Sequence, residues 1–180
     1  MTAPWTLALW ALVAVAVLLL LRTAARRPQR FRVTRTAVIK APAARVFALI
    51  NDLKTFNTWS RYLRGDATAQ GHYSGPASGV GAAYVWQSRK AGSGSLTITR
   101  SEAPVGLAMT LAFTQPALAP HGAEFTLWAE GEHLTIVSWV VHGPAPFRTR
   151  WRGLFVDTDR PIGQGLEADL ANLKALAQGR

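Results

Sequence analysis

The feature that most constrains this chain is an uninterrupted apolar segment at its N-terminus. From Ala3 to Leu21 there is no charged residue, and Thr6 is the one strongly polar residue. A helix of this length, at about 1.5 Å per residue, nearly matches the roughly 30 Å hydrocarbon core of a bilayer. The sequence therefore predicts one N-terminal transmembrane helix, which forms an anchor within residues 1–22.

A cleaved signal peptide is the main alternative for this segment. Signal peptides normally carry a basic N-terminal region, a shorter apolar stretch and a cleavage site of small residues. Here no basic side chain precedes the apolar run, and the small residues at 23–25 are followed by Arg26 and Arg27. An uncleaved single-pass anchor is favoured, and a secreted or periplasmic protein with a processed signal is the alternative.

The arginines that follow the apolar run predict its orientation. They are Arg22, Arg26, Arg27, Arg30, Arg32 and Arg35. Because positive flanks stay inside, the globular part is expected in the cytoplasm, with the N-terminus outside. Residues 23–30 form a basic juxtamembrane linker that also favours anionic headgroups. This arrangement accounts for a chain that is 49% hydrophobic and yet carries a formal charge of +10.

The composition excludes several kinds of site. Without cysteine there is no disulfide, thiolate metal site or cysteine nucleophile. The few histidines and acids show no metal-ligand spacing, so we expect no metal and no cofactor. The basic residues lack the interleaved aromatic residues that suit nucleic acid, and no nucleic-acid partner is expected.

Hydrophobic periodicity organises residues 31–180 as one domain. Residues 31–40 alternate as a strand, with Arg35 interrupting the apolar side. Pro42 opens a helix with the stripe Val46, Phe47 and Ile50, and a short helix or turn covers residues 53–59. Six strands follow at about 67–73, 81–88, 94–102, 105–114, 122–129 and 134–142. Apolar residues from 147 to 177 then predict an amphipathic helix of roughly thirty residues, kinked or split at Pro161.

Short motifs in this order resemble a known superfamily. They include Ile39-Lys40-Ala41-Pro42 before Val46-Phe47, Ile50-Asn51-Asp52 before Trp59-Ser60, and Tyr73-Ser74-Gly75-Pro76 before Gly79-Val80-Gly81. With these motifs the chain resembles the START-like, or SRPBCC, helix-grip proteins, and specifically their polyketide cyclase/dehydrase and lipid-transport branch. The resemblance implies an α+β fold of order β-α-α-β6-α. In that fold a seven-stranded antiparallel sheet grips a long C-terminal helix, and two short helices close an apolar cavity.

The strand parity implied by this resemblance predicts which residues line the cavity. They are Trp59, Tyr84, Trp86, Met109, Leu111, Phe113, Phe125, Leu127, Val137, Trp139, Phe147, Trp151 and Phe155. Most of them also serve as core, because a domain of this size needs one in any case.

Catalytic candidates are few. No histidine or acid is paired by spacing with a nucleophile or a second acid, so no triad, dyad or metal cluster can be assembled. If the protein performs acid/base chemistry, His72 and Tyr84 are the candidates, since both are expected on strands near the wide end of the cavity.

The opposite face of the last strands is unusually apolar. A three-residue connection at 130–132 would place Trp128 opposite Leu134 and Thr126 opposite Ile136, all on the outer face. With Val140 and small neighbours, this surface holds one charge, that of Glu124. Since solvated sheet faces are normally polar, a protein partner, a second copy or the membrane is expected to cover Trp128, Leu134, Ile136 and Val140.

Three functions fit these features. The leading hypothesis is membrane-anchored binding or transfer of a lipid or other hydrophobic small molecule. A cyclase/dehydratase-like enzyme without cofactor is the second, although whether the chain is an enzyme stays open. The third is a membrane-associated interaction module that uses the outer sheet face.

Overall fold

The computed structural model of the chain describes residues 4–26, 28–60, 70–89, 92–154 and 159–179. Its contacts divide it into two compact units. The first unit comprises Met1–Phe31 with Pro144–Thr158, and the second comprises Arg32–Gly143 with Asp159–Arg180.

The first unit contains two helices, α1 (Pro4–Arg26) and α5 (Phe147–Arg152). Within α1, the 18 residues Leu9–Arg26 are long and apolar enough to cross a membrane, and both a membrane span and a signal sequence have these properties. Arg150 Nη1 donates a hydrogen bond to the Ala25 carbonyl oxygen at 3.0 Å, which ties α5 to the end of α1.

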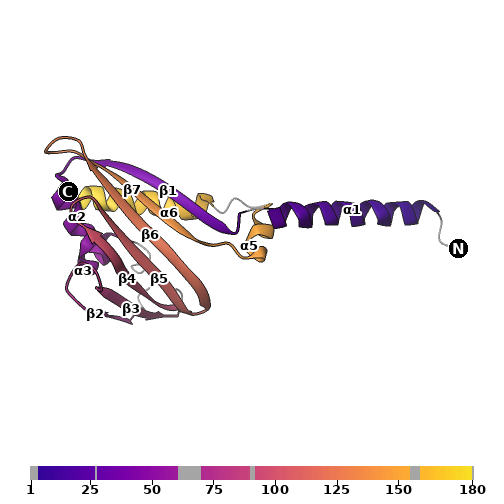
Figure 1. Cartoon of the computed structure of the whole chain (residues 1–180), viewed down its shortest axis with the longest axis horizontal. Helices are drawn as coiled ribbons and strands as arrows, with labels where there is room; N and C mark the ends of the chain where they lie inside the picture. Colours follow the sequence, from indigo (N-terminus) through magenta and orange to yellow (C-terminus); the bar gives the residue numbers. More distant parts are fainter. Residues whose placement is uncertain (1–3, 27, 61–69, 90–91, 155–158, 180) are drawn as a thin grey trace. The chain divides into compact units, whose positions relative to one another are not determined.

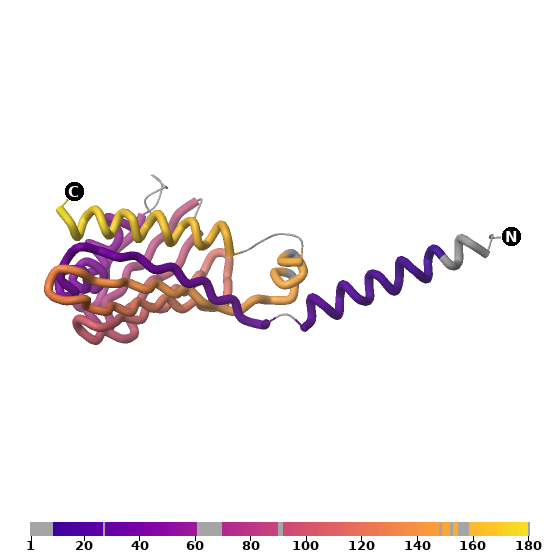
Figure 2. The backbone as a smooth tube through the Cα atoms, turned by 90° about the horizontal axis from the view of Figure 1, so that it is seen from above, coloured from indigo at the N-terminus to yellow at the C-terminus, as the bar shows by residue number. Residues whose placement is uncertain are grey.

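The second unit is built on a seven-stranded antiparallel sheet that curves around one helix (Figures 1 and 2). The strand order is β1-β7-β6-β5-β4-β3-β2. The strands are β1 (Arg30–Ile39), β2 (Gln70–Ser74), β3 (Ala83–Ser88), β4 (Gly92–Glu102), β5 (Gly106–Gln115), β6 (Ala117–Ala129) and β7 (Thr135–Pro144). The gripped helix is α6 (Asp159–Ala177). The expected helix-grip fold is therefore confirmed.

Two short helices lie between β1 and β2, and their sequences explain their buried faces and their boundary. Helix α2 (Ala43–Asn51) buries Val46, Phe47 and Ile50 on one face. Asp52 then ends α2 and caps α3 (Leu53–Trp59), because its carboxylate accepts from Lys54 N and from Thr55 Oγ1, both at 2.9 Å. This is the N-capping role that aspartate favours.

The C-terminal helical region is split in two, which is one of the two outcomes expected from Pro161. The chain forms α5 and α6 separately, and the break lies before Pro161, which occupies the first turn of α6. A proline is tolerated there because the first backbone N–H groups of a helix have no partner within it. The expected split is therefore confirmed, and it lies just before Pro161.

The structure corrects the expected register of the β6–β7 hairpin. Trp128 lies opposite Ile136 and Thr126 opposite Ser138, and the last pair is Ala129 with Thr135. The loop is longer than three residues, with Glu130 N donating to Leu134 O at 2.8 Å. Because the shift is two residues, each side chain stays on its expected face.

Candidate ligand-binding site

One face of the sheet, called the inner face below, carries most of the predicted cavity residues. The register pairs Phe125 with Trp139 and Leu127 with Val137, and directly paired residues share a face. Tyr84, Trp86, Met109, Phe125, Leu127, Val137 and Trp139 are buried, and Leu111 and Phe113 are half-buried. The alternation of the strands therefore collects these distant positions on a single apolar surface.

Helices α3 and α6 pack over part of this face. The ring centroids of Trp59, on α3, and Phe125, on β6, lie 6.3 Å apart. Asn172 Nδ2 of α6 donates to the Trp59 carbonyl oxygen at 2.9 Å, which links the two helices. Trp59 is thus a point where sheet, short helix and long helix meet.

Four rings form a compact group, called the ring cluster below, made of Phe56, Trp59, Phe125 and Trp139. Their centroid distances run from 4.6 Å for Phe56–Trp59 and 4.7 Å for Phe125–Trp139 to 6.3 Å for Phe56–Phe125. Most of the contacts are edge-to-face, the arrangement that the charge distribution of aromatic rings favours. Phe56 was not predicted, although its position three residues before Trp59 puts it on the same helix face.

The two tryptophans of the ring cluster differ in their polar atoms. Trp59 Nε1 donates to the Leu49 carbonyl oxygen at 3.0 Å. Trp139 Nε1 is buried and has no hydrogen-bond acceptor in the described part of the chain.

A second aromatic surface, called the aromatic floor below, consists of Tyr84 and Trp86 on β3. Their rings are nearly parallel, at 14°, with centroids 6.5 Å apart. Each ring lies against a glycine of a neighbouring strand. A Cβ atom at Gly71 would collide with the Tyr84 hydroxyl, and one at Gly94 would come within 2.7 Å of the Trp86 ring. The sequence does not predict the role of these two glycines, because that role depends on strand register.

Burial shifts the pKa of two groups on the inner face. Burial, followed by the nearby Tyr73, raises the pKa of Tyr84. His121 pairs with Leu111, and the centroid of its ring lies 5.7 Å from that of Phe113. Burial is the main cause that lowers the pKa of His121, and the nearby His142 adds to it. Both shifts favour the neutral forms, as expected in apolar surroundings.

The two candidate catalytic residues are not brought together. His72 pairs with Val85 and Tyr73 with Tyr84, so His72 points to the opposite face from Tyr84. His142 Nε2 lies 3.1 Å from Glu124 Oε1, but these two residues also lie on the outer face. Among the described residues, no group of three His, Cys, Asp or Glu side chains is placed to hold a metal ion.

Three predicted cavity residues do not belong to the second unit. Phe147 and Trp151 lie on α5 in the first unit, where Phe147 is exposed and Trp151 half-buried. Phe155 falls outside the described residues.

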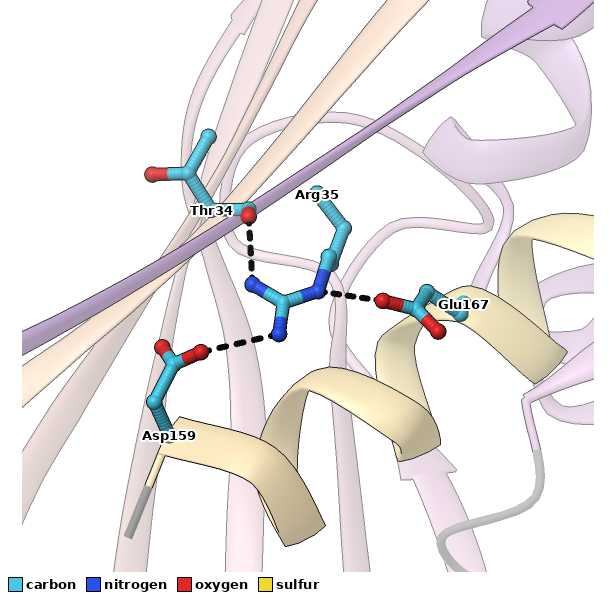
Figure 3. A network of polar contacts seen from close by, with 4 residues as sticks. All are labelled: Thr34, Arg35, Asp159 and Glu167. Atoms are coloured by element: carbon cyan, nitrogen blue, oxygen red, sulfur yellow. Dashed lines mark hydrogen bonds and ion pairs between the residues drawn. The ribbon is translucent and has the colours of Figure 1, made fainter. Parts of the chain in front are cut away.

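A polar clamp attaches β1 to the first half of α6 (Figure 3). Arg35 Nε donates to Glu167 at 2.6 Å and Nη2 to Asp159 at 2.9 Å, while Nη1 donates to the Thr34 carbonyl oxygen at 2.9 Å. The guanidinium lies directly on Gly163, where a Cβ atom would collide with it. This explains why an arginine interrupts the apolar side of β1.

A groove of about 420 Å³ has no aromatic residue in its lining. It is lined by Gln70, Gln87, Ser88, Arg89, Ser93, Thr114 and Gln115. None of the predicted cavity residues lines it, and its amide, hydroxyl and guanidinium groups do not suit an apolar ligand.

Solved structures share this architecture. Protein Ms6760 from Mycobacterium smegmatis is 17% identical, with a TM-score of 0.52 over 82% of this chain and 91% of that chain. Protein MLL2253 from Mesorhizobium loti is 14% identical, with a TM-score of 0.60 over 82% and 97%. Norcoclaurine synthase from Thalictrum flavum, in complex with dopamine and hydroxybenzaldehyde, is 9% identical, with a TM-score of 0.61 over 84% and 88%. These likenesses show that the chain shares the helix-grip fold.

The sequence also matches a family model directly. The model for polyketide cyclase / dehydrase and lipid transport covers residues 30–178. The chain belongs to this family, whose fold binds hydrophobic ligands. A comparison with curated protein sequences finds no match.

Proposed function

We propose that this protein binds a lipid or another hydrophobic small molecule against the inner face of its sheet, at a membrane to which α1 anchors it. The observation that carries the proposal is the composition of the inner face. It carries the ring cluster and the aromatic floor on one apolar surface, covered in part by α3 and α6. Apolar surfaces with few polar groups are typical of sites for hydrophobic ligands.

The fold and family are consistent with this choice. Lipid transport is part of the description of the family to which the chain belongs. In addition, the norcoclaurine synthase of similar fold holds small aromatic molecules in its structure. The inner face offers no His72–Tyr84 pair for acid/base catalysis, so binding requires fewer assumptions than turnover.

Ligand binding is tested on the full chain purified in detergent. Denaturing extraction followed by mass spectrometry should release one class of hydrophobic compound in a near-constant ratio to protein. A Tyr84→Arg variant that retains the wild-type circular dichroism spectrum should lose that compound, because a charge on the inner face opposes apolar binding. Repeated recovery of wild-type protein without any such compound would count against the proposal.

Anchoring rests on α1 and the arginines that follow it. The helix is long enough to span a bilayer, and the positive flank predicts a cytoplasmic globular domain. A C-terminal alkaline phosphatase fusion, which is active only outside the cytoplasm, should be inactive. Intact-mass measurement should find residues 1–26 still attached. An active fusion would reverse the orientation, and a shortened mass would indicate a signal peptide.

A second candidate function is interaction through the outer face. Trp128 is 50% exposed there, beside half-buried Ile136 and Leu134 and buried Val140. A partner protein or a second copy would remove the Trp128 ring from water. Site-specific photo-cross-linking at residue 128 in intact cells tests this idea. A discrete adduct that disappears with the cross-linker moved to exposed Val80 supports it, and an absence of adducts removes it.

A further inference from the structure

The unpartnered indole N–H of Trp139 is the feature of the inner face that the packing does not explain. Trp139 is only 5% exposed, and the centroid of its ring lies 5.8 Å from that of Trp59. A buried tryptophan normally finds an acceptor for its N–H, because burying a bare donor loses its hydrogen bonds to water. Trp59 follows this rule through Leu49, whereas Trp139 does not within the described part of the chain.

The neighbours of Trp139 do not supply what is missing. Phe56 and Phe125, which contact its ring, carry no side-chain acceptor. The Trp59 carbonyl oxygen already accepts from Asn172. A buried water needs two to four polar partners, and among these rings it would have the Trp139 N–H alone. Phenylalanine, although smaller than tryptophan, would keep an aromatic ring at this position without an unsatisfied donor.

We propose that the ligand of the inner face presents an uncharged oxygen acceptor to Trp139 Nε1. This inference rests on the proposed function, since it concerns the same binding surface. The ligand class is then a hydrophobic molecule with a carbonyl, ester or hydroxyl oxygen, rather than a plain hydrocarbon. A carboxylate or phosphate does not fit, because the rings around Trp139 provide no countercharge for a buried anion.

Two probes that differ in one oxygen test the proposal. They are 2-acetylnaphthalene and 2-ethylnaphthalene, in which a carbonyl replaces a methylene group. Their affinities for the full chain in lipid nanodiscs are measured by titration calorimetry, with partitioning into empty nanodiscs subtracted. The ketone should bind the wild-type protein about tenfold more tightly, the upper range for one net hydrogen bond.

Matched variants assign that preference to a single N–H. Trp139→Phe should abolish the ketone preference while keeping the affinity for 2-ethylnaphthalene within about twofold. Trp59→Phe, which removes an indole N–H that is already paired with Leu49, should keep the preference. If Trp139→Phe retains the ketone preference, or if the wild-type protein binds both probes equally, the inference is overturned and the proposed function stands. If neither probe binds the wild-type protein, both fail.

A measurement on the wild-type chain removes any dependence on how Trp139→Phe folds. With ¹⁵N-labelled tryptophan, the chain gives indole N–H signals from its seven tryptophans. One of them should move downfield with the ketone and not with 2-ethylnaphthalene, and it should be retained in Trp59→Phe. The absence of a ketone-specific shift in a sample that binds the ketone would overturn the inference.

Discussion

The ring cluster and the aromatic floor are both aromatic and buried, yet they are built in different ways. In the ring cluster, Phe56 and Trp59 of α3 meet Phe125 and Trp139 of the sheet, mostly edge to face. In the aromatic floor, Tyr84 and Trp86 lie nearly parallel against glycines of β2 and β4. The cluster joins two layers of the fold, whereas the floor lies within one.

This difference separates two ways of stabilising an apolar face. The cluster depends on the volume of its own side chains, because each ring fills space left by another. The aromatic floor depends on the absence of side chains at Gly71 and Gly94. A methyl group at either position would overlap the ring of Tyr84 or of Trp86. Removing atoms should therefore harm the first region most, and adding atoms the second.

The largest expected effect is at the centre of the ring cluster. Phe125→Ala should lower the free energy of unfolding by about 3–5 kcal/mol, because it leaves a cavity among three other rings. Phe125 is fully buried. Chemical unfolding of the full chain in detergent, followed by circular dichroism, measures the loss. The control is Trp128→Ala on the outer face of the same strand, where half of the side chain is exposed and a much smaller loss is expected. Equal losses would contradict the distinction between the two faces.

The aromatic floor should respond to one added methyl group. Gly94→Ala should cost about 1–3 kcal/mol through overpacking, because the new Cβ would meet the Trp86 ring and the Ala112 carbonyl oxygen. Gly165→Ala on α6 is the matched control. It meets no atom within 4 Å, and helix propensity predicts a gain of up to about 1 kcal/mol. If Gly94→Ala leaves the free energy of unfolding unchanged, the aromatic floor has room for a methyl group. That result would contradict the close contacts at Gly94.

The polar clamp holds α6 to β1 through ion pairs, and it should respond to salt. Arg35→Gln should lower the melting temperature more at low than at high ionic strength, because screening already weakens the ion pairs in the native chain. Arg100→Gln is the control, since its contact with Glu102 is longer, at 3.8 Å, and more exposed. An equal salt dependence of the two variants would mean that the clamp adds nothing beyond an ordinary surface pair.

The smallest expected effect is the pH response of His121, near the aromatic floor. Because its pKa is lowered in the folded chain, the unfolded chain takes up a proton first as the pH falls below about 6.5. Its contribution to stability is therefore present above that pH and is lost as the pH falls further. Unfolding free energies from pH 7.5 to 5 should decline less steeply in His121→Gln, and His133→Gln in the exposed hairpin loop should leave the decline unchanged. A slope unaffected by His121→Gln would exclude this residue as the cause.

Some parts of this molecule follow from the sequence. An apolar run without charges predicts α1. Strand alternation, with the inward side taken from the family resemblance, predicts that Met109, Phe125, Leu127 and Trp139 share a buried face. The alternation itself is a property of the backbone. The order of the elements, with the motifs between them, also identified the family.

Other features were decided only when distant segments met. The two-residue shift of the β6–β7 hairpin and the roles of Gly71, Gly94 and Gly163 depend on which atoms lie opposite one another. The missing acceptor of Trp139 belongs here too, since it reflects neighbours from α3 and β6 rather than adjacent residues. Periodicity determines which face a side chain occupies. Tertiary packing determines which atoms that side chain contacts. A contact depends on two positions that can be distant in the chain, whereas a periodic pattern is read from neighbouring positions.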